Sequence, residues 1–190
     1  MNLTELSKQV HAAAKANGFW EGERNVGEIF MLIISEAAEA LEAHRKGKFA
    51  DLQGYEGERK SVADSLLFHI RGFEKYIKDS FEDELADVVI RVLDYAGSRD
   101  LDVSIIEGNI EDLSLETNIG AMLCDTCEYI IQARLSVEYK ATDKKVSANL
   151  RQVLRQVFAI AKFSNIDLER HIELKLKYNK TRPYKHGKNY

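Results

Sequence analysis

The stretch that decides the fold class is Glu84-Leu-Ala-Asp87-Val-Val-Ile-Arg91-Val-Leu-Asp94-Tyr-Ala, residues 84–96 of a chain of 190 residues. With about 100° of turn per residue in an α-helix, its charged side chains share one arc of about 80°, and the rest of the helix is apolar. A surface helix usually has a polar face nearer half of its circumference. The pattern therefore predicts a buried helix whose narrow acidic stripe lines an internal cleft.

A second acidic pair lies upstream, in the run Glu28-Ile-Phe-Met-Leu-Ile-Ile-Ser-Glu36-Ala-Ala-Glu39-Ala-Leu-Glu-Ala. Helical spacing puts Glu36 in the apolar stripe of this segment and Glu39 at the edge of that stripe, toward the polar side. Two helices therefore each carry a pair of acids next to a buried face.

Acids in such surroundings need partners, because an unpaired buried carboxylate costs several kcal/mol. A hard divalent cation with oxygen ligands would satisfy all four, and Mg²⁺ completes its shell with water and substrate phosphates, which points to a triphosphate site. The alternative is that the acids form salt bridges with Arg91 and nearby lysines. It stays open because the chain is 31% charged, so acidic i, i+3 pairs also arise freely on solvated helices.

Helical periodicity recurs along the chain, and Pro183 is its only proline. We expect helices over residues 3–17, 26–46, 61–78, 81–98, 115–139, 142–163 and 168–178. The predicted N-caps or near-caps are Thr4, Asn25, Ser61, Ser80, Ser114 and Thr142, and the predicted stops are Gly18, Gly47 and Gly97. Residues 49–60 are interpreted as a loop, and no strand pattern competes. The expectation is one all-α domain over residues 1–190, a helical bundle.

Two short signals occur twice and suggest a degenerate internal repeat. Long helices begin at Asn25-Val-Gly and Asn118-Ile-Gly, and later ones close at Asp100-Leu-Asp and Asn165-Ile-Asp. Aligning the closing signals puts Asn149 opposite Glu84 and Gln152 opposite Asp87. Residues 1–103 would then be the metal-binding half. Residues 104–190 would hold a decayed copy with amides in place of acids, followed by the basic C-terminal segment.

Composition argues against several classes of protein. The net charge of −4 and pI near 5.8 favour no nucleic-acid partner. No apolar run approaches the roughly 20 residues that span a bilayer, and residues 1–19 lack a signal-peptide core, so we expect a cytoplasmic protein without a membrane partner.

Cys124 and Cys127 could form a redox pair or half a zinc site, but their i, i+3 spacing and the lack of a second pair favour plain core cysteines.

The two acidic pairs resemble the all-α nucleoside-triphosphate pyrophosphohydrolases, a superfamily that includes MazG-like enzymes and the dimeric dUTPases. The shared pattern is Glu-x-x-Glu on one helix and Glu-x-x-Asp on another, here Glu36-Ala-Ala-Glu39 and Glu84-Leu-Ala-Asp87. The resemblance implies that these four side chains bind Mg²⁺, with Mn²⁺ as a substitute, and that Glu36 and Glu39 are catalytic. It also implies hydrolysis of a (d)NTP to a monophosphate and pyrophosphate, as in nucleotide-pool house-cleaning.

Two further segments extend the resemblance to substrate-binding residues. His11, Trp20 and the following Arg24-Asn25 are similar to the nucleotide-contacting segment of some dCTP-cleaving members, although a surface histidine and a core tryptophan are equally compatible with the residues alone. Arg91 lies four residues after Asp87, so helical geometry aims it along the same stripe.

The C-terminal segment contains Lys175-x-x-x-Asn179-x-x-Arg182-Pro, which resembles the segment that reaches the phosphates in MazG-like members. From composition alone it could equally be a solvated basic terminus.

The match covers about residues 5–102 and 168–187, and it has departures. Ser35 stands where many members have a further Glu, the stretch 40–83 is long, and residues 104–165 lie outside the simple family pattern. A homodimer is expected because two helix pairs make one bundle in this family, although an internal copy could let a monomer suffice.

Two other classes of protein remain for comparison. A ferritin-like di-iron bundle needs Glu-x-x-His on two helices, and no Glu-x-x-His occurs in the sequence. A non-catalytic helical nucleotide-binding or assembly module, whose acids form only salt bridges, stays open. The nucleobase and sugar also stay open.

Overall fold

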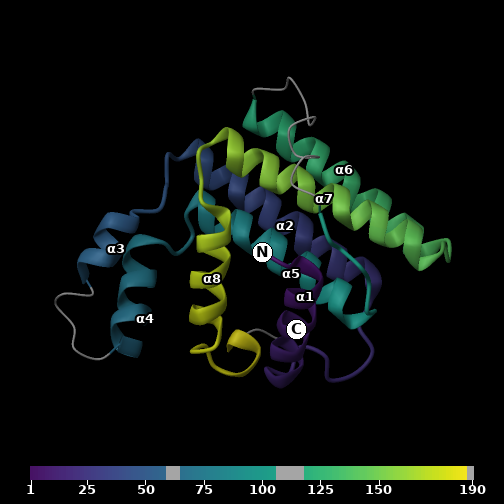
Figure 1. The fold of residues 1–190 in the computed structure, drawn as a ribbon, viewed down its shortest axis with the longest axis horizontal. Coiled ribbons are helices and arrows are strands. Elements are labelled where there is room, and N and C mark those ends of the chain that lie inside the picture. Colours follow the sequence, from purple (N-terminus) through teal and green to yellow (C-terminus); the bar gives the residue numbers. More distant parts are fainter. Residues whose placement is uncertain (59–64, 106–117, 188–190) are drawn as a thin grey trace.

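The structure is a computed structural model that describes residues 1–58, 65–105 and 118–187 (Figure 1). These residues are all-helical, which confirms the predicted fold class. The helices are α1 (Leu3–Ala16), α2 (Val26–Arg45), α3 (Leu52–Glu58), α4 (Ser65–Tyr76), α5 (Phe81–Ser98), α6 (Ile119–Glu138), α7 (Asp143–Phe163), α8 (Leu168–Asn179) and the short 3-10 helix η2 (Tyr184–Gly187). None of the described helices has the length and apolar character needed to cross a bilayer.

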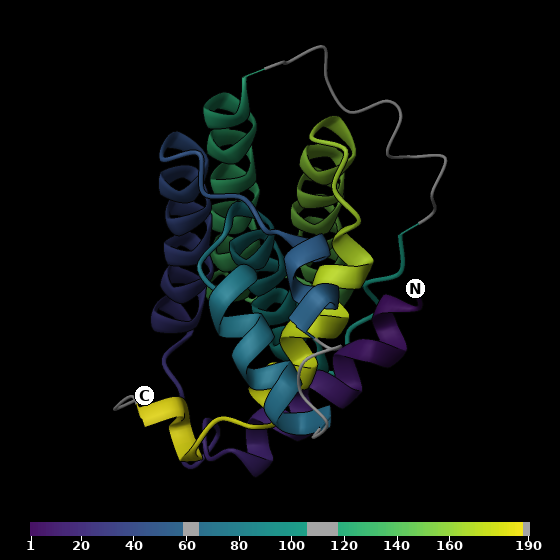
Figure 2. The same ribbon diagram turned by 90° about the vertical axis from the view of Figure 1, so that its left-hand side faces the viewer.

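The core is a bundle of α2, α5, α6 and α7. In this bundle α2 packs on α5 and α6, and α7 packs on α6 and α5 (Figures 1 and 2). The valines of α5 at positions 88, 89 and 92 are completely buried. The remaining sides of α5 contact α1 and α8. The prediction of a buried helix over residues 84–96 is therefore confirmed.

A second, smaller core joins α3, α4 and α8. Its buried residues are Tyr55, Phe68, Phe73, Ile77, Leu174 and Tyr178. The rings of Phe73 and Tyr178 stack with centroids 4.4 Å apart, which attaches α8 to α4. The prediction of a loop over residues 49–60 is wrong, because α3 forms there. The Asp51 carboxylate accepts the N–H of Gly54 at the start of this helix, and burial of Tyr55 stabilises it.

Most helix boundaries follow the expected caps. The side chains of Asn25, Ser80 and Thr142 each accept the backbone N–H three residues on, as predicted. Helix α1 begins at Leu3, as predicted. Its cap is Asn2, which accepts the N–H of Glu5 at 3.1 Å, and Thr4 lies two residues further on, in the first turn. The described part of α6 is capped by Asn118. The predicted caps Ser61 and Ser114, and the first residues of their helices, lie outside the described residues.

Glycines end two helices but not the third. Gly18 and Gly47 have φ of +84° and +64° directly after α1 and α2, which confirms them as stops. Gly97 is wrong as a stop because it lies inside α5, which continues to Ser98. A Cβ at position 97 would overlap the Ser7 carbonyl oxygen and lie 2.7 Å from the Cβ of His11. The glycine is therefore required by the close crossing of α1 and α5.

The pair α2 and α5 and the pair α6 and α7 resemble each other in several features. α2 and α6 are both 20 residues long, and Asp100 and Asn165 adopt left-handed φ values of 50° and 56° after α5 and α7. Asn149, the predicted counterpart of Glu84, is buried and donates to the Gln132 carbonyl and the Ser136 hydroxyl. The internal repeat itself stays a prediction.

The expectation of core cysteines is wrong for Cys124, which is exposed, whereas Cys127 is half-buried against the core. Both are free thiols. The buried face of α6 is formed instead by neighbours such as Leu123, Thr126 and Ile130, so the turn of the helix carries Cys124 outward.

Candidate metal centre and cleft

A cleft of about 790 Å³ opens beside α5, between α1, α2 and α8. Its volume lies within the range of small-molecule sites in proteins. Most of the predicted site residues line it: Glu36, Glu39, Glu84, Asp87, Arg91, Lys175, Asn179 and Arg182. The structure therefore brings together side chains from α2, α5, α8 and the C-terminal segment that are far apart in the sequence.

Three acids form what we call the carboxylate cluster: Glu36 and Glu39 of α2 and Glu84 of α5. Each offers one oxygen, and these oxygens all lie within 4.8 Å of one another. Glu36 and Glu84 are only 6% and 5% exposed, whereas Glu39 is exposed. The cluster is therefore built into the wall of the cleft and opens to solvent at Glu39.

The pKa of Glu84 is raised by its burial and by the negative charges of neighbouring carboxylates. Burial raises it to about 9, and the neighbouring carboxylates of Asp87 and Asp83 add to the shift. Burial also raises the pKa of Glu36, followed by the effect of Asp87, against the opposing effect of Arg91. Among the described residues, no hydrogen bond or ion pair reaches the Glu84 carboxylate. A hard divalent cation fits this donor set, because all the ligands are oxygens and one side remains open for water or phosphate.

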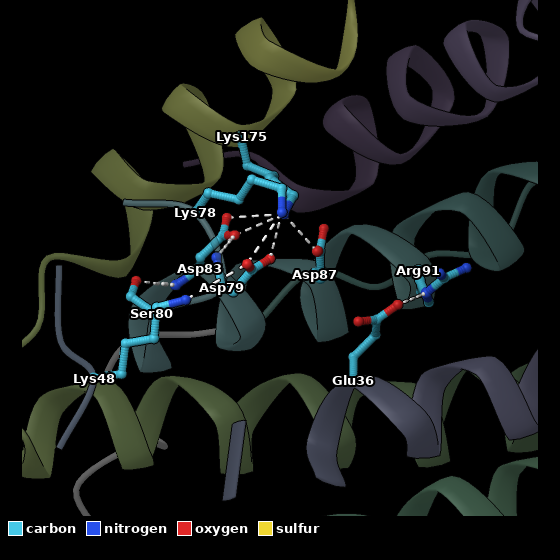
Figure 3. A network of polar contacts seen from close by, with 9 residues as sticks. All are labelled: Glu36, Lys48, Lys78, Asp79, Ser80, Asp83, Asp87, Arg91 and Lys175. Atoms are coloured by element: carbon cyan, nitrogen blue, oxygen red, sulfur yellow. Dashed lines mark hydrogen bonds and ion pairs between the residues drawn. The ribbon is translucent and has the colours of Figure 1, made fainter. Parts of the chain in front are cut away.

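Arg91 pairs with the cluster from the same stripe of α5. Its Nε donates to Oε1 of Glu36 (Figure 3). The side chain of Arg91 keeps 30% of its surface exposed, so part of its guanidinium group remains accessible from the cleft. This is one of the salt bridges that the alternative interpretation expects.

Lys175 makes the second ion pair, with Asp83 and Asp87. The Lys175 Nζ lies 2.6 Å from Oδ2 of Asp87 and 2.9 Å from both carboxylate oxygens of Asp83 (Figure 3). Lys175 and Asp83 are only 6% and 1% exposed. Burial by itself would lower the pKa of Lys175, but the carboxylates of Asp87 and Asp83 outweigh it and raise the pKa. The ammonium is therefore a fixed charge in the wall of the cleft, and α8 is not a solvated basic terminus.

Sequence reasoning missed Asp83. Its position three residues after the N-cap Ser80 indicates a role at the start of α5. The Ser80 hydroxyl accepts the N–H of Asp83, and the Asp83 carboxylate accepts the N–H of Asp79 at 2.9 Å. Capping alone accounts for an acid in the first turn of a helix, so only the position of α8 reveals that Asp83 also binds a lysine.

Comparisons with known proteins add no relative: no family model, curated protein or solved structure matches the chain. The resemblance to the pyrophosphohydrolases therefore rests on the two acidic pairs and the flanking segments.

Asn179 and Arg182 complete the cationic and polar side of the cleft. Arg182 is half-buried, and its backbone N–H donates to the Asn179 carbonyl at 3.3 Å. The side-chain oxygen of Asn179 is buried and has no hydrogen-bond partner among the described residues. Both residues thus lie where a ligand in the cleft would meet them.

His11 and Trp20 adjoin the cleft through Asp94, which lines it. The Asp94 carboxylate accepts the Trp20 Nε1–H at 3.0 Å and lies 2.9 Å from Nδ1 of His11. The two rings meet edge to face with centroids 4.9 Å apart, and the Arg24 guanidinium lies over the indole at 5.4 Å. In this arrangement His11 and Trp20 hold an acid that faces the cleft.

Proposed function

We propose that this protein is a Mg²⁺-dependent nucleoside triphosphate pyrophosphohydrolase of the MazG-like type, with Mn²⁺ as a substitute metal. The reaction would be (d)NTP and water to (d)NMP and pyrophosphate. The observation that carries the proposal is the carboxylate cluster of Glu36, Glu39 and Glu84 in a cleft that also presents Arg91 and Arg182. Acids alone would repel a triphosphate, whereas acids that hold a cation beside two arginines attract it.

In this proposal Glu36, Glu39 and Glu84 hold the metal, with Asp87 next to them. The metal, when bound, would neutralise charge on the phosphate oxygens and lower the pKa of a coordinated water. Glu39 is the exposed carboxylate of the three, and in this proposal it would hold the attacking water and accept its proton. The water oxygen would bond to the α-phosphorus while the bond to the α–β bridging oxygen breaks, which releases pyrophosphate.

Other cleft residues would bind the rest of the nucleotide. Arg91 and Arg182 are planar cations suited to bidentate contact with phosphate oxygens. Leu32 and Ile90 offer apolar surface for a nucleoside, close to Asp94 with His11 and Trp20 behind it. The volume of about 790 Å³ is sufficient for a nucleotide.

A second candidate is a non-catalytic nucleotide-binding or assembly module. The ion pairs of Glu36 with Arg91 and of Lys175 with Asp83 and Asp87 favour it, because two of the four predicted metal ligands, Glu36 and Asp87, already have a protein cation as partner. This candidate predicts ligand binding that does not depend on a divalent cation. The homodimer and a house-cleaning role are parts of the first proposal that rest on the resemblance, and the cytoplasmic location is a part that rests on the hydropathy of the sequence.

The test is a turnover assay with a matched pair of variants on α2. Each canonical nucleoside triphosphate is incubated with Mg²⁺ or with EDTA, and products are separated by ion-exchange chromatography. Glu39→Gln should lower kcat by about 100-fold or more. Glu42→Gln changes an exposed acid one turn further on that pairs with Arg45 and Lys46, and it should leave the rate within about twofold.

The possible results separate the two candidates. Monophosphate and pyrophosphate, lost with EDTA and with Glu39→Gln, would support the pyrophosphohydrolase. Diphosphate and phosphate would overturn the assigned bond. If no nucleotide turns over, binding of a non-hydrolysable triphosphate analogue can be followed by the fluorescence of Trp20, the only tryptophan. Binding without a metal requirement would then favour the binding module.

A further inference from the structure

The cleft contains a second group of acids next to the carboxylate cluster. Oxygens of Asp79, Asp83 and Glu84 also lie within 4.8 Å of one another. Glu84 belongs to both groups, so the start of α5 takes part in two adjacent positions for a cation. Glu36 and Glu39 of α2 complete one of them, and Asp83 and Asp79, two residues before the helix, complete the other.

The second position is already neutralised by protein cations. Lys175 contacts Asp83 and Asp87 at 2.6–2.9 Å, and all three lie together in Figure 3. Asp79 is paired with Lys78 at 2.9 Å and with Lys48 at 3.5 Å. The carboxylate cluster, in contrast, has Arg91 as its only ion-pair partner in the described part of the chain. The two positions therefore differ in charge although they share Glu84.

We propose that the Lys175 ammonium takes the place of a second divalent cation, so that the cleft holds a single metal ion, at the carboxylate cluster. This inference rests on the metal centre of the proposed function. Lys175 acts here as a positioning residue: it holds Asp87 toward α8 and leaves Glu84 to the metal at the other side.

The anchoring of α8 explains why a lysine serves as this cation. Stacking of Tyr178 on Phe73 and burial of Ile172 and Leu174 fix the helix on both sides of Lys175. The packing of α8 therefore holds the Lys175 ammonium next to Asp83 and Asp87, and its three N–H donors match the carboxylate oxygens around it. Removing the ammonium would leave Asp83 buried without a counter-charge, a state that a divalent cation could relieve.

The experiment is a Mn²⁺ titration followed by electron paramagnetic resonance of the free ion, without nucleotide. Wild type and Lys175→Arg should bind one Mn²⁺, whereas Lys175→Met should bind two. Lys177→Met is the matched control, since Lys177 is an exposed lysine on the same helix, and it should bind one. Thermal unfolding adds a second readout: Lys175→Met should have a lowered Tm in EDTA that Mn²⁺ restores.

Several results would overturn the inference. Two ions in the wild type, or one ion in Lys175→Met without recovery of Tm, would show that the ammonium does not replace a metal, while the metal centre would stand. Failure of Lys175→Met to fold even with Mn²⁺ would overturn it as well, because an ion would then not substitute for the lysine. No ion in the wild type would overturn both the inference and the metal centre.

Discussion

At the residue scale, Glu84 links the chemistry of the cleft to pH. Its pKa of about 9, set by burial and by Asp87 and Asp83, means that the metal-free protein holds a proton there at neutral pH. A divalent cation binds the ionised carboxylate, so ion binding must release that proton. We predict that Mn²⁺ affinity rises by about tenfold per pH unit below pH 9.

Calorimetry in buffers of different ionisation enthalpy measures this proton release directly. Glu84→Gln should abolish the release, and the same carboxyl-to-amide change at exposed Glu42 should not. A wild-type affinity that is unchanged between pH 6.5 and 8.5, where one proton per ion predicts about a hundredfold rise, would show that Glu84 is not a ligand.

Gly97 lies where α1 and α5 cross too closely to leave room for a Cβ. Ala at this position would place a Cβ against the Ser7 carbonyl and 2.7 Å from the Cβ of His11. We predict that Gly97→Ala lowers the free energy of unfolding by about 1–3 kcal/mol, because α1 must move away from α5. Gly57→Ala is the control: a Cβ there meets nothing within 4 Å, and replacing a helical glycine should be neutral or mildly stabilising. Urea unfolding of both variants checks the difference.

At the scale of elements, α8 carries the cleft cation and depends on buried neutral histidines. His171 of α8 is 3% exposed and His69 of α4 is fully buried. Burial lowers the pKa of each to about 4. His69 lies 2.7 Å from the Tyr55 hydroxyl through its Nδ1, which joins α4 to α3.

We predict that acid weakens the docking of α8 and α4. Because the folded pKa values lie below the usual 6.5, the unfolded chain binds more protons between about pH 6.5 and 4, so these histidines lower the stability as pH falls through that window. Tm measured against pH should fall there, and His171→Gln should flatten the slope. An unchanged slope in this variant would contradict a neutral buried His171.

At the scale of the whole molecule, the α6–α7 pair covers the α2–α5 pair within one chain (Figure 2). The reason for expecting a homodimer was that one helix pair needs a second to complete a bundle, and here the chain supplies the second pair itself. We predict that a cooperative thermal transition persists at the lowest protein concentration that can be measured, because the four-helix core is completed within one chain. Loss of this transition on dilution would show an obligate dimer, whereas a Tm that rises with concentration would show that association of folded chains adds to stability. The homodimer itself stays a prediction, which light scattering can check against the chain mass of 21.6 kDa.

The helical class, most helix ends and the acidic stripe of α5 could be predicted from the residues alone. Periodicity, caps such as Asn25 and Ser80, and the spacing from Glu84 to Asp87 are local properties, because they depend on residues within one or two turns. The buried surroundings of these acids and the family resemblance both predict that they bind a metal.

The partners of these acids, in contrast, follow from how the helices pack. Lys175 reaches Asp83 across 92 residues of sequence, Gly97 is required by the crossing of α1, and α3 forms because Tyr55 is buried against its neighbours. Such contacts depend on how the helices pack against one another, and helices with the same pattern of apolar residues can pack at several crossing angles. The sequence therefore shows that charge accumulates on α5, whereas the position of α8 decides that a lysine neutralises one side of it and leaves the carboxylate cluster open.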